Sequence, residues 1–257
     1  MISKPWTLPA LAILVIVAAA CGRQAPTAIG DATPPRAPAS QAASGPATEG
    51  ADPGQWTMDY TAALAKAAES GLPLLLNFTG SDWCGWCRLM DKQVFSTSDW
   101  QAWARDNLIL VWIDFPKDKN LVPDKYRERN DALSQQYGVR GFPTYFVLDS
   151  NGRTVLGTAG AERDITPKTF IAKIEAILIS SEKSVAALRA TMSPEDQALL
   201  DAAREAHAQA RKKLDDWLET QPDETPENIA LFQTMRQNIL TTETQFISVL
   251  RKASASE

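Results

Sequence analysis

The segment WCGWC, residues 83–87, places two of the chain's three cysteines three positions apart. It follows LPLLLNF, residues 72–78, a continuous apolar run that predicts a buried strand. The segment CRLMDKQVF, residues 87–95, predicts a helix that starts at the cysteines. A CxxC pair at such a strand–loop–helix junction is compatible with a structural disulfide, a zinc site or a redox centre.

The rest of the sequence favours redox chemistry. A zinc site needs four ligands, and the single histidine, His207, is far away and is expected to be a solvated helix residue. A disulfide between such close neighbours removes little entropy from the unfolded chain, although a structural staple remains an alternative. At a helix start, free N–H groups favour the thiolate of Cys84, and Cys87, one turn further in, is expected to be more shielded and to resolve mixed disulfides. We expect no metal and no cofactor.

Strands and helices are predicted to alternate around this junction. We expect helices at 60–69, 98–106, 130–137 and 166–179, strands at 72–78 and 108–115, a charged loop at 116–128, and a two-stranded hairpin within 142–156. The hairpin turn is indicated by Asn151-Gly152. This order predicts an α/β sandwich around a central mixed sheet.

Two segments carry a family resemblance. FTGSDWCGWC (78–87) and YGVRGFPTYFVLDSNG (137–152) resemble the thioredoxin superfamily, most closely the extracytoplasmic thioredoxin-like proteins and thiol:disulfide interchange domains of bacteria. The resemblance covers residues 55–180 and implies a thioredoxin-like fold.

The resemblance also implies roles for matched positions. Cys84 matches the attacking cysteine and Cys87 the resolving one, while Pro143 matches a cis-proline that shapes the substrate groove. The positions expected to contact substrate are Trp83, Gly85, Trp86, Phe142 and Pro143.

The sequence departs from the thioredoxin pattern at two places. Asn77 stands where thioredoxin has a buried aspartate, and an amide exchanges no proton at neutral pH. We therefore expect Asp82 or water to exchange the proton of the resolving cysteine, or this proton transfer to be slower. Gly85-Trp86 stands in place of the Gly-Pro dipeptide between the cysteines, and this dipeptide influences the reduction potential of the pair. The sequence therefore does not decide whether the protein is a reductant, an oxidant or an isomerase.

The N-terminus predicts export. Residues 1–20 contain one lysine, no acid, an apolar stretch and small residues directly before Cys21, which is the pattern of a signal peptide. The junction resembles a bacterial lipoprotein, which implies a lipid on Cys21; Gly22 then favours the outer membrane, on the periplasmic side of the cell envelope. Residues 21–54, rich in Ala and Pro, predict a disordered tether.

The C-terminal part, residues 183–257, has a different character. Helix starts are predicted at Ser193-Pro194 and Thr225-Pro226. Two apolar stripes follow, one of Leu199, Ala203, Ala206, Ala210, Leu214 and Trp217, the other of Phe232, Met235, Ile239, Phe246 and Leu250. They predict an antiparallel helical hairpin that packs on itself, on the domain at 55–182, or on a partner such as a second copy.

These observations predict an extracytoplasmic thiol:disulfide oxidoreductase that exchanges disulfides with protein substrates. A reductant or isomerase is favoured, with a membrane thiol reductase or oxidase as redox partner. The alternative is a redox-inert thioredoxin-like lipoprotein that serves as a binding scaffold. A net charge of −5 without a basic patch argues against nucleic acid.

Overall fold

A computed structural model describes residues 45–255 of the chain. The predicted signal peptide, the predicted lipid site Cys21 and most of the predicted tether lie outside the described residues. No helix in the described part is long and apolar enough to cross a membrane.

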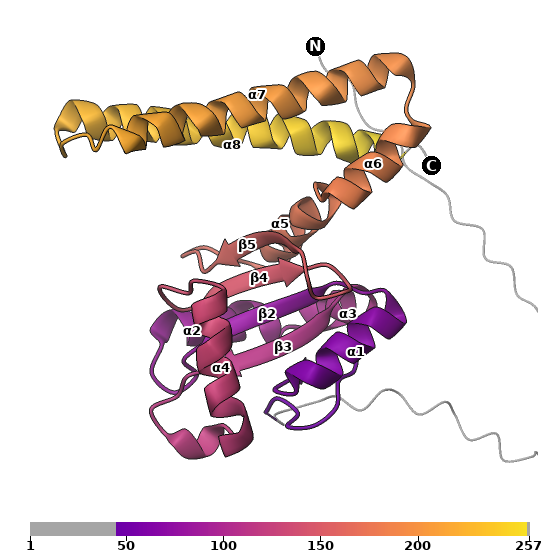
Figure 1. The fold of residues 1–257 in the computed structure, drawn as a ribbon, viewed down its shortest axis with the longest axis vertical. Helices are drawn as coiled ribbons and strands as arrows, with labels where there is room; N and C mark the ends of the chain where they lie inside the picture. The colour runs from indigo at the N-terminus through magenta and orange to yellow at the C-terminus, as the bar shows by residue number, and fades with distance from the viewer. Residues whose placement is uncertain (1–44, 256–257) are drawn as a thin grey trace, which may run out of the picture. The chain divides into compact units, whose positions relative to one another are not determined.

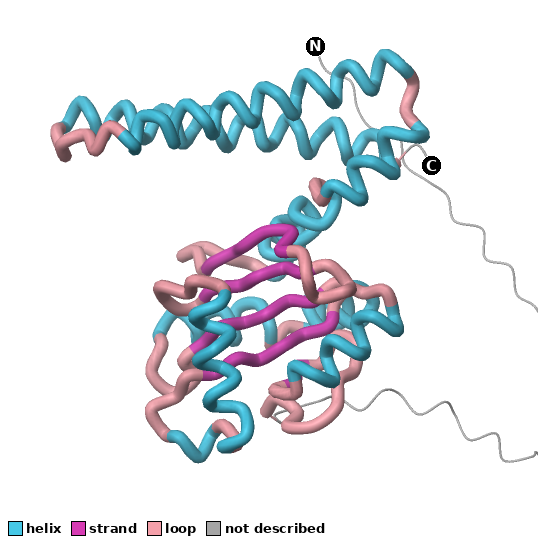
Figure 2. The backbone as a smooth tube through the Cα atoms, viewed as in Figure 1, coloured by secondary structure: helices cyan, strands magenta, loops and turns pink. Residues whose placement is uncertain are grey.

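The centre of the fold is a five-stranded mixed sheet with the order β1-β3-β2-β4-β5. The strands are β1 (Trp56–Thr57), β2 (Leu74–Thr79), β3 (Ile109–Asp114), β4 (Thr144–Leu148) and β5 (Val155–Gly160). The β1–β3 and β2–β3 pairs are parallel, whereas β2–β4 and β4–β5 are antiparallel. The predicted mixed sheet is therefore confirmed, and Figure 2 shows its strands in magenta.

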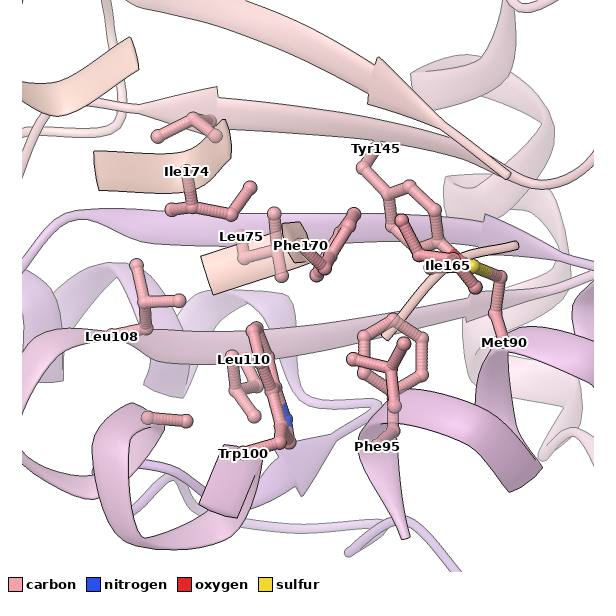
Figure 3. Packing of buried hydrophobic residues seen from close by; sticks show 13 residues of the cluster. Leu75, Met90, Phe95, Trp100, Leu108, Leu110, Tyr145, Ile165, Phe170 and Ile174 are labelled. Carbon is pink, nitrogen blue, oxygen red and sulfur yellow. The ribbon is translucent and has the colours of Figure 1, made fainter. Parts of the chain in front are cut away.

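Helices cover both faces of this sheet (Figure 1). They are α1 (Tyr60–Ser70), α2 (Gly85–Met90), α3 (Ser98–Asn107), α4 (Asp124–Gln136) and α5 (Pro167–Ile179), with a π-helical turn η1 (Asp91–Phe95) and a 3₁₀ turn η2 (Lys119–Leu121). Leu75 and Leu110 face one side, where Trp100 of α3 and Phe170 of α5 complete the core (Figure 3). The alternate strand residues face α1 and α4. Burial on both faces explains why β2 and β3 are continuous apolar runs.

The segment before β1 is more ordered than the sequence predicts. Within the range expected to be a disordered tether, the Ala47 N–H donates to the Trp56 carbonyl at 2.9 Å, and the Gly54 N–H donates to the Leu108 carbonyl at 2.9 Å. The Tyr126 hydroxyl donates to the Thr48 carbonyl at 2.5 Å. Residues 45–54 therefore belong to the folded domain, because their backbone groups find partners there that the Ala/Pro-rich composition does not reveal.

The charged loop is also shorter than expected. α4 begins at Asp124 instead of residue 130, directly after Pro123. Tyr126 in its first turn is buried with Met58 and Val122, and this contact holds the helix start against the domain.

The C-terminal part consists of α6 (Glu182–Thr191), α7 (Pro194–Glu219) and α8 (Pro226–Ser254). Both predicted starts are confirmed: Ser193 Oγ accepts a hydrogen bond from the Asp196 N–H, and Thr225 Oγ1 accepts one from the Asn228 N–H. The helices α7 and α8 form the predicted antiparallel hairpin (Figure 1). The short helix α6, which the sequence did not predict, precedes the hairpin in the chain.

The seam between α7 and α8 has a different phase from the predicted stripe. Leu199 is 52% exposed and Ala206 is exposed, whereas Leu200 is buried. His207 lies in the seam instead of in solvent, with its Nδ1 3.3 Å from Thr242 Oγ1. The residues that face α8 follow Leu200 at intervals of three and four. Because the predicted stripe started one residue too early, at Leu199, it placed Leu199 and Ala206 on the wrong face of α7.

The base of the hairpin contacts α5. Val185 and Leu188 of α6 pack with Phe246 and Leu250 of α8, and Ile179 of α5 packs against the same cluster. An Arg251 guanidinium N–H also donates to the Ala172 carbonyl at 3.3 Å. The hairpin is thereby joined to the last helix of the α/β domain.

Candidate active site

The cysteines lie at the predicted strand–loop–helix junction. β2 ends at Thr79, which pairs with Asp114 at the end of β3, and Phe78 pairs with Thr144 at the start of β4. The loop that leaves this edge of the sheet leads to Cys84, which is the N-cap residue of α2.

Cys84 and Cys87 form a disulfide, with their Cα atoms 5.2 Å apart. The Cys87 N–H donates a hydrogen bond to Cys84 Sγ at 3.1 Å. This amide is one of the N–H groups that a helix start leaves without a partner in the helix. An N–H in this position stabilises a thiolate at Cys84 when the disulfide is reduced.

The exposure of the two cysteines differs from the expectation. Cys84 is 4% exposed and Cys87 is 6% exposed, so both residues are buried to a similar degree in the disulfide form. The tryptophans are the accessible groups, because Trp83 is 40% and Trp86 is 46% exposed. The surface around the disulfide is therefore aromatic, and Trp86 lies exposed in the first turn of α2.

Three consecutive residues before Cys84 form hydrogen bonds with the last residue of β3 and the segment that follows it. Asp114 accepts hydrogen bonds from the Ser81 N–H at 2.9 Å and from the Ser81 hydroxyl at 2.5 Å. Trp83 Nε1 donates to the Phe115 carbonyl at 2.8 Å. These bonds fix the loop that presents Cys84.

Asp82, between Ser81 and Trp83, also forms hydrogen bonds with the segment after β3. Its carboxylate accepts hydrogen bonds from the Asp118 N–H at 2.9 Å and the Lys117 N–H at 3.0 Å. These amides lower the pKa of the Asp82 carboxyl below its usual value of 3.8. Asp82 is therefore an ionised anchor of the loop, which does not favour it as the proton acceptor for Cys87.

Asp114 is a site residue that the sequence analysis missed. It is 4% exposed and is the single charged residue of LILVWIDF, residues 108–115. A lone acid at the end of a buried strand is the signal that could have identified it, since a buried carboxylate needs hydrogen-bond donors.

Phe142 and Pro143 lie beside the loop. The Phe142–Pro143 peptide is cis, as predicted. The Phe142 ring centroid is 5.7 Å from that of Trp83 and 5.3 Å from that of Phe115. The structure thus brings the two predicted groups of site residues together, one from 83–87 and one from 142–143.

The strand beneath the site carries Asn77 in place of an ionisable residue. Asn77 is 2% exposed and pairs with Tyr145 in the β2–β4 ladder. Its Oδ1 accepts no hydrogen bond from residues 45–255. Burial raises the pKa of the Tyr145 hydroxyl, so neither side chain releases a proton at neutral pH.

Comparison with known proteins agrees with this geometry. Residues 60–178 match the family model of the thioredoxin-like domain. The disulfide bond reductase DsbH of Chlamydia pneumoniae is 39% identical over 99 residues, which are 38% of this chain and 58% of that protein. The thioredoxin-related protein DsbJ of the same organism is 30% identical over 109 residues, 42% of this chain and 31% of that protein. The chain therefore spans less than two thirds of either relative.

Among solved structures, DsbH oxidoreductase has 34% identity and a TM-score of 0.46, covering 51% of this chain and 88% of that one. A thioredoxin from Thermus thermophilus has 20% identity and a TM-score of 0.38, covering 49% of this chain and 88% of that one. The helices α7 and α8 lie outside the residues that match the family model. The strand order, the CxxC disulfide at the start of α2 and the family match together show that residues 60–178 form a thioredoxin-like domain.

Proposed function

We propose that the chain is an extracytoplasmic thiol:disulfide oxidoreductase that exchanges disulfides with protein substrates. The observation that carries this proposal is the Cys84–Cys87 disulfide at the start of α2, with the Cys87 N–H directed at Cys84 Sγ. This N–H favours the reactive thiolate of Cys84. A purely structural disulfide between such close neighbours would add little to stability, which also favours a redox role.

In the reducing direction, the Cys84 thiolate attacks one sulfur of a substrate disulfide. A bond forms between Cys84 and that sulfur, the substrate S–S bond breaks, and the departing substrate sulfur takes a proton. The Cys87 thiolate then attacks Cys84 Sγ, forming the Cys84–Cys87 disulfide and releasing the second substrate sulfur. Two electrons pass from the protein to the substrate.

Substrate is proposed to bind at the aromatic surface beside the disulfide. The exposed rings of Trp83 and Trp86 provide apolar contacts, and the backbone at Gly85 is open, since a Cβ there would meet nothing within 4 Å. The segment Phe142-Pro143 borders Trp83 and offers backbone hydrogen bonds to an extended chain.

The direction of electron flow is proposed to be reductive, as a reductant or isomerase. The name of the relative DsbH, a disulfide bond reductase, supports this choice. A membrane thiol reductase would return the pair to the dithiol form. We expect a Cys84–Cys87 reduction potential below about −180 mV in a glutathione titration; a value near about −120 mV would indicate an oxidant.

The N-terminal pattern supports placement at the periplasmic side of the cell envelope. There the signal peptide would be removed and a lipid on Cys21 would anchor the chain, with the outer membrane favoured. Loss of the membrane-bound form on Cys21→Ser is the expected result. A wild-type chain that carries no fatty acid would contradict the anchor.

Insulin reduction separates this function from that of a redox-inert binding scaffold. The full chain should accelerate insulin precipitation in the presence of dithiothreitol, and Cys84→Ser should reduce the rate to background. Cys21→Ser is the matched control, because it removes a cysteine outside the pair and should keep the rate. A wild-type rate equal to background would favour the scaffold.

A further inference from the structure

The free end of the helical hairpin carries exposed apolar side chains. Here the end of α7, the loop and the start of α8 are called the tip, residues 214–232. Leu218, Ile229 and Leu231 are 45%, 47% and 40% exposed, respectively. Leu218 and Leu231 are each adjacent in sequence to one of two half-buried, stacked rings, those of Trp217 and Phe232, whose centroids are 6.3 Å apart.

A hollow on the hairpin shares Asp216 and Trp217 with the tip. It has a volume of about 460 Å³, and its other lining residues, Gln209, Lys212, Lys213 and Met235, lie outside the tip. Met235 is 8% exposed, so the half-buried ring of Trp217 provides the large apolar contact area that the hollow shares with the tip. The tip therefore presents apolar surface that the hairpin itself does not bury.

The tip is also strongly acidic. It contains six acids, Asp215, Asp216, Glu219, Asp223, Glu224 and Glu227, and no Lys or Arg, so its charge of −6 exceeds the −5 of the whole chain. All six are exposed. In the part of the chain that the structure describes, one of them is ion-paired: Asp216 lies 2.7 Å from Lys212.

Two of these acids, Asp215 and Glu219, lie where they oppose helix formation, whereas Asp216 pairs with Lys212 on the same helix. The last turns of α7 contain Asp215, Asp216 and Glu219, next to the negative end of the helix dipole, where Lys or Arg would be stabilising. Glu227, in the first turn of α8, has the favourable sign. Acids that disfavour the end of α7 indicate that the charge serves something other than helix stability.

We propose that the tip is a docking surface for a segment of another protein that carries Lys or Arg beside apolar side chains. The apolar side chains would be covered by those of the partner, and the unpaired acids would attract its cations. A second copy docked tip to tip would bring two surfaces of charge −6 together, and nucleic acid or an anionic lipid surface would also be repelled.

The test titrates the full chain with two synthetic amphipathic peptides, one of leucine and lysine and one of leucine and glutamate with the same leucines. The lysine peptide should bind, more tightly at low salt, and the glutamate peptide should not. Leu218→Ser combined with Leu231→Ser should weaken binding about fivefold or more. Leu199→Ser combined with Leu240→Ser, which alters leucines outside the tip that are slightly more exposed, should change it less than about twofold.

A second set of variants tests the charge. Glu219→Gln, Asp223→Asn and Glu227→Gln together should weaken binding and flatten its salt dependence. Glu128→Gln with Glu243→Gln, which removes exposed acids elsewhere, should not. Equal effects of tip and control variants, or binding that ignores the tip leucines, would overturn the proposal. So would tip-dependent dimerisation in sedimentation, or tip-dependent binding to phosphatidylcholine vesicles in place of the peptide.

Discussion

At the scale of single residues, the loop before Cys84 is held by side chains that contact a distant part of the chain. Ser81, Asp82 and Trp83 each form hydrogen bonds with residues 114–118, more than thirty positions away in sequence. The position of Cys84 at the helix start therefore depends on the end of β3 as much as on its own neighbours.

Asp82→Asn should destabilise the protein in a pH-dependent way. The Asp118 and Lys117 amides lower the pKa of the Asp82 carboxyl, so its contribution is fully present above the unfolded value of 3.8 and is lost as the pH falls through the lower folded value. Urea unfolding should show a lower midpoint for the variant at neutral pH and a smaller difference below pH 3.8.

Asp131→Asn, on an exposed position of α4, is the control for this measurement. It should leave the midpoint near that of the wild type at both pH values. A constant gap between Asp82→Asn and the wild type at every pH would show that the loss is steric and not electrostatic.

At the scale of elements, the segment before β1 packs against the domain although its composition predicts disorder. Gly54 has a φ of 71°, and a Cβ there would lie 2.5 Å from the Arg105 backbone of α3. Gly50 has a φ of 75°, but a Cβ there would meet nothing within 4 Å.

Gly54→Ala should therefore cost much more stability than Gly50→Ala. Both alanines adopt the left-handed conformation at a cost of about 1–2 kcal/mol, and the clash with α3 adds to the cost at Gly54 alone. Thermal or urea unfolding of the two variants provides the comparison. Equal losses would mean that the segment does not pack against α3 in solution.

Local patterns could be predicted from the sequence and long-range contacts could not. The junction at 83–87 and the turn at Asn151-Gly152 were predicted because a few adjacent residues determine them. The prediction of which α7 residues face α8 was wrong by one position. Leu199 and Leu200 are both apolar, and only the position of α8 determines which of them is buried. The bonds from Asp114 to Ser81 were missed because they join residues 33 positions apart.

At the scale of the whole molecule, the base of the hairpin is joined to the thioredoxin-like domain through one apolar cluster. Leu250 is fully buried there, beside α6 and close to Ile179 of α5. The cluster links a domain that carries a disulfide to a hairpin that extends beyond the residues matched by the family model.

Leu250→Ala should lower stability by about 2–5 kcal/mol, because it removes buried methyl groups from this cluster. Leu240→Ala on the same helix is the control, since Leu240 is 51% exposed and should have little effect. Melting temperatures of the two variants give the comparison. A loss at Leu250 no larger than that at Leu240 would show that the base contact does not form in solution.

The central claim is that Cys84 attacks substrate disulfides and Cys87 resolves the product. Trapping tests it most directly: the full-length Cys87→Ser and Cys84→Ser variants are expressed, free thiols are alkylated, and the proteins are separated on non-reducing gels. Cys87→Ser should accumulate reducible mixed disulfides with other proteins, because the bond at Cys84 can no longer be broken from within. Cys84→Ser should not. Equal trapping by both variants, or none by either, would contradict the account.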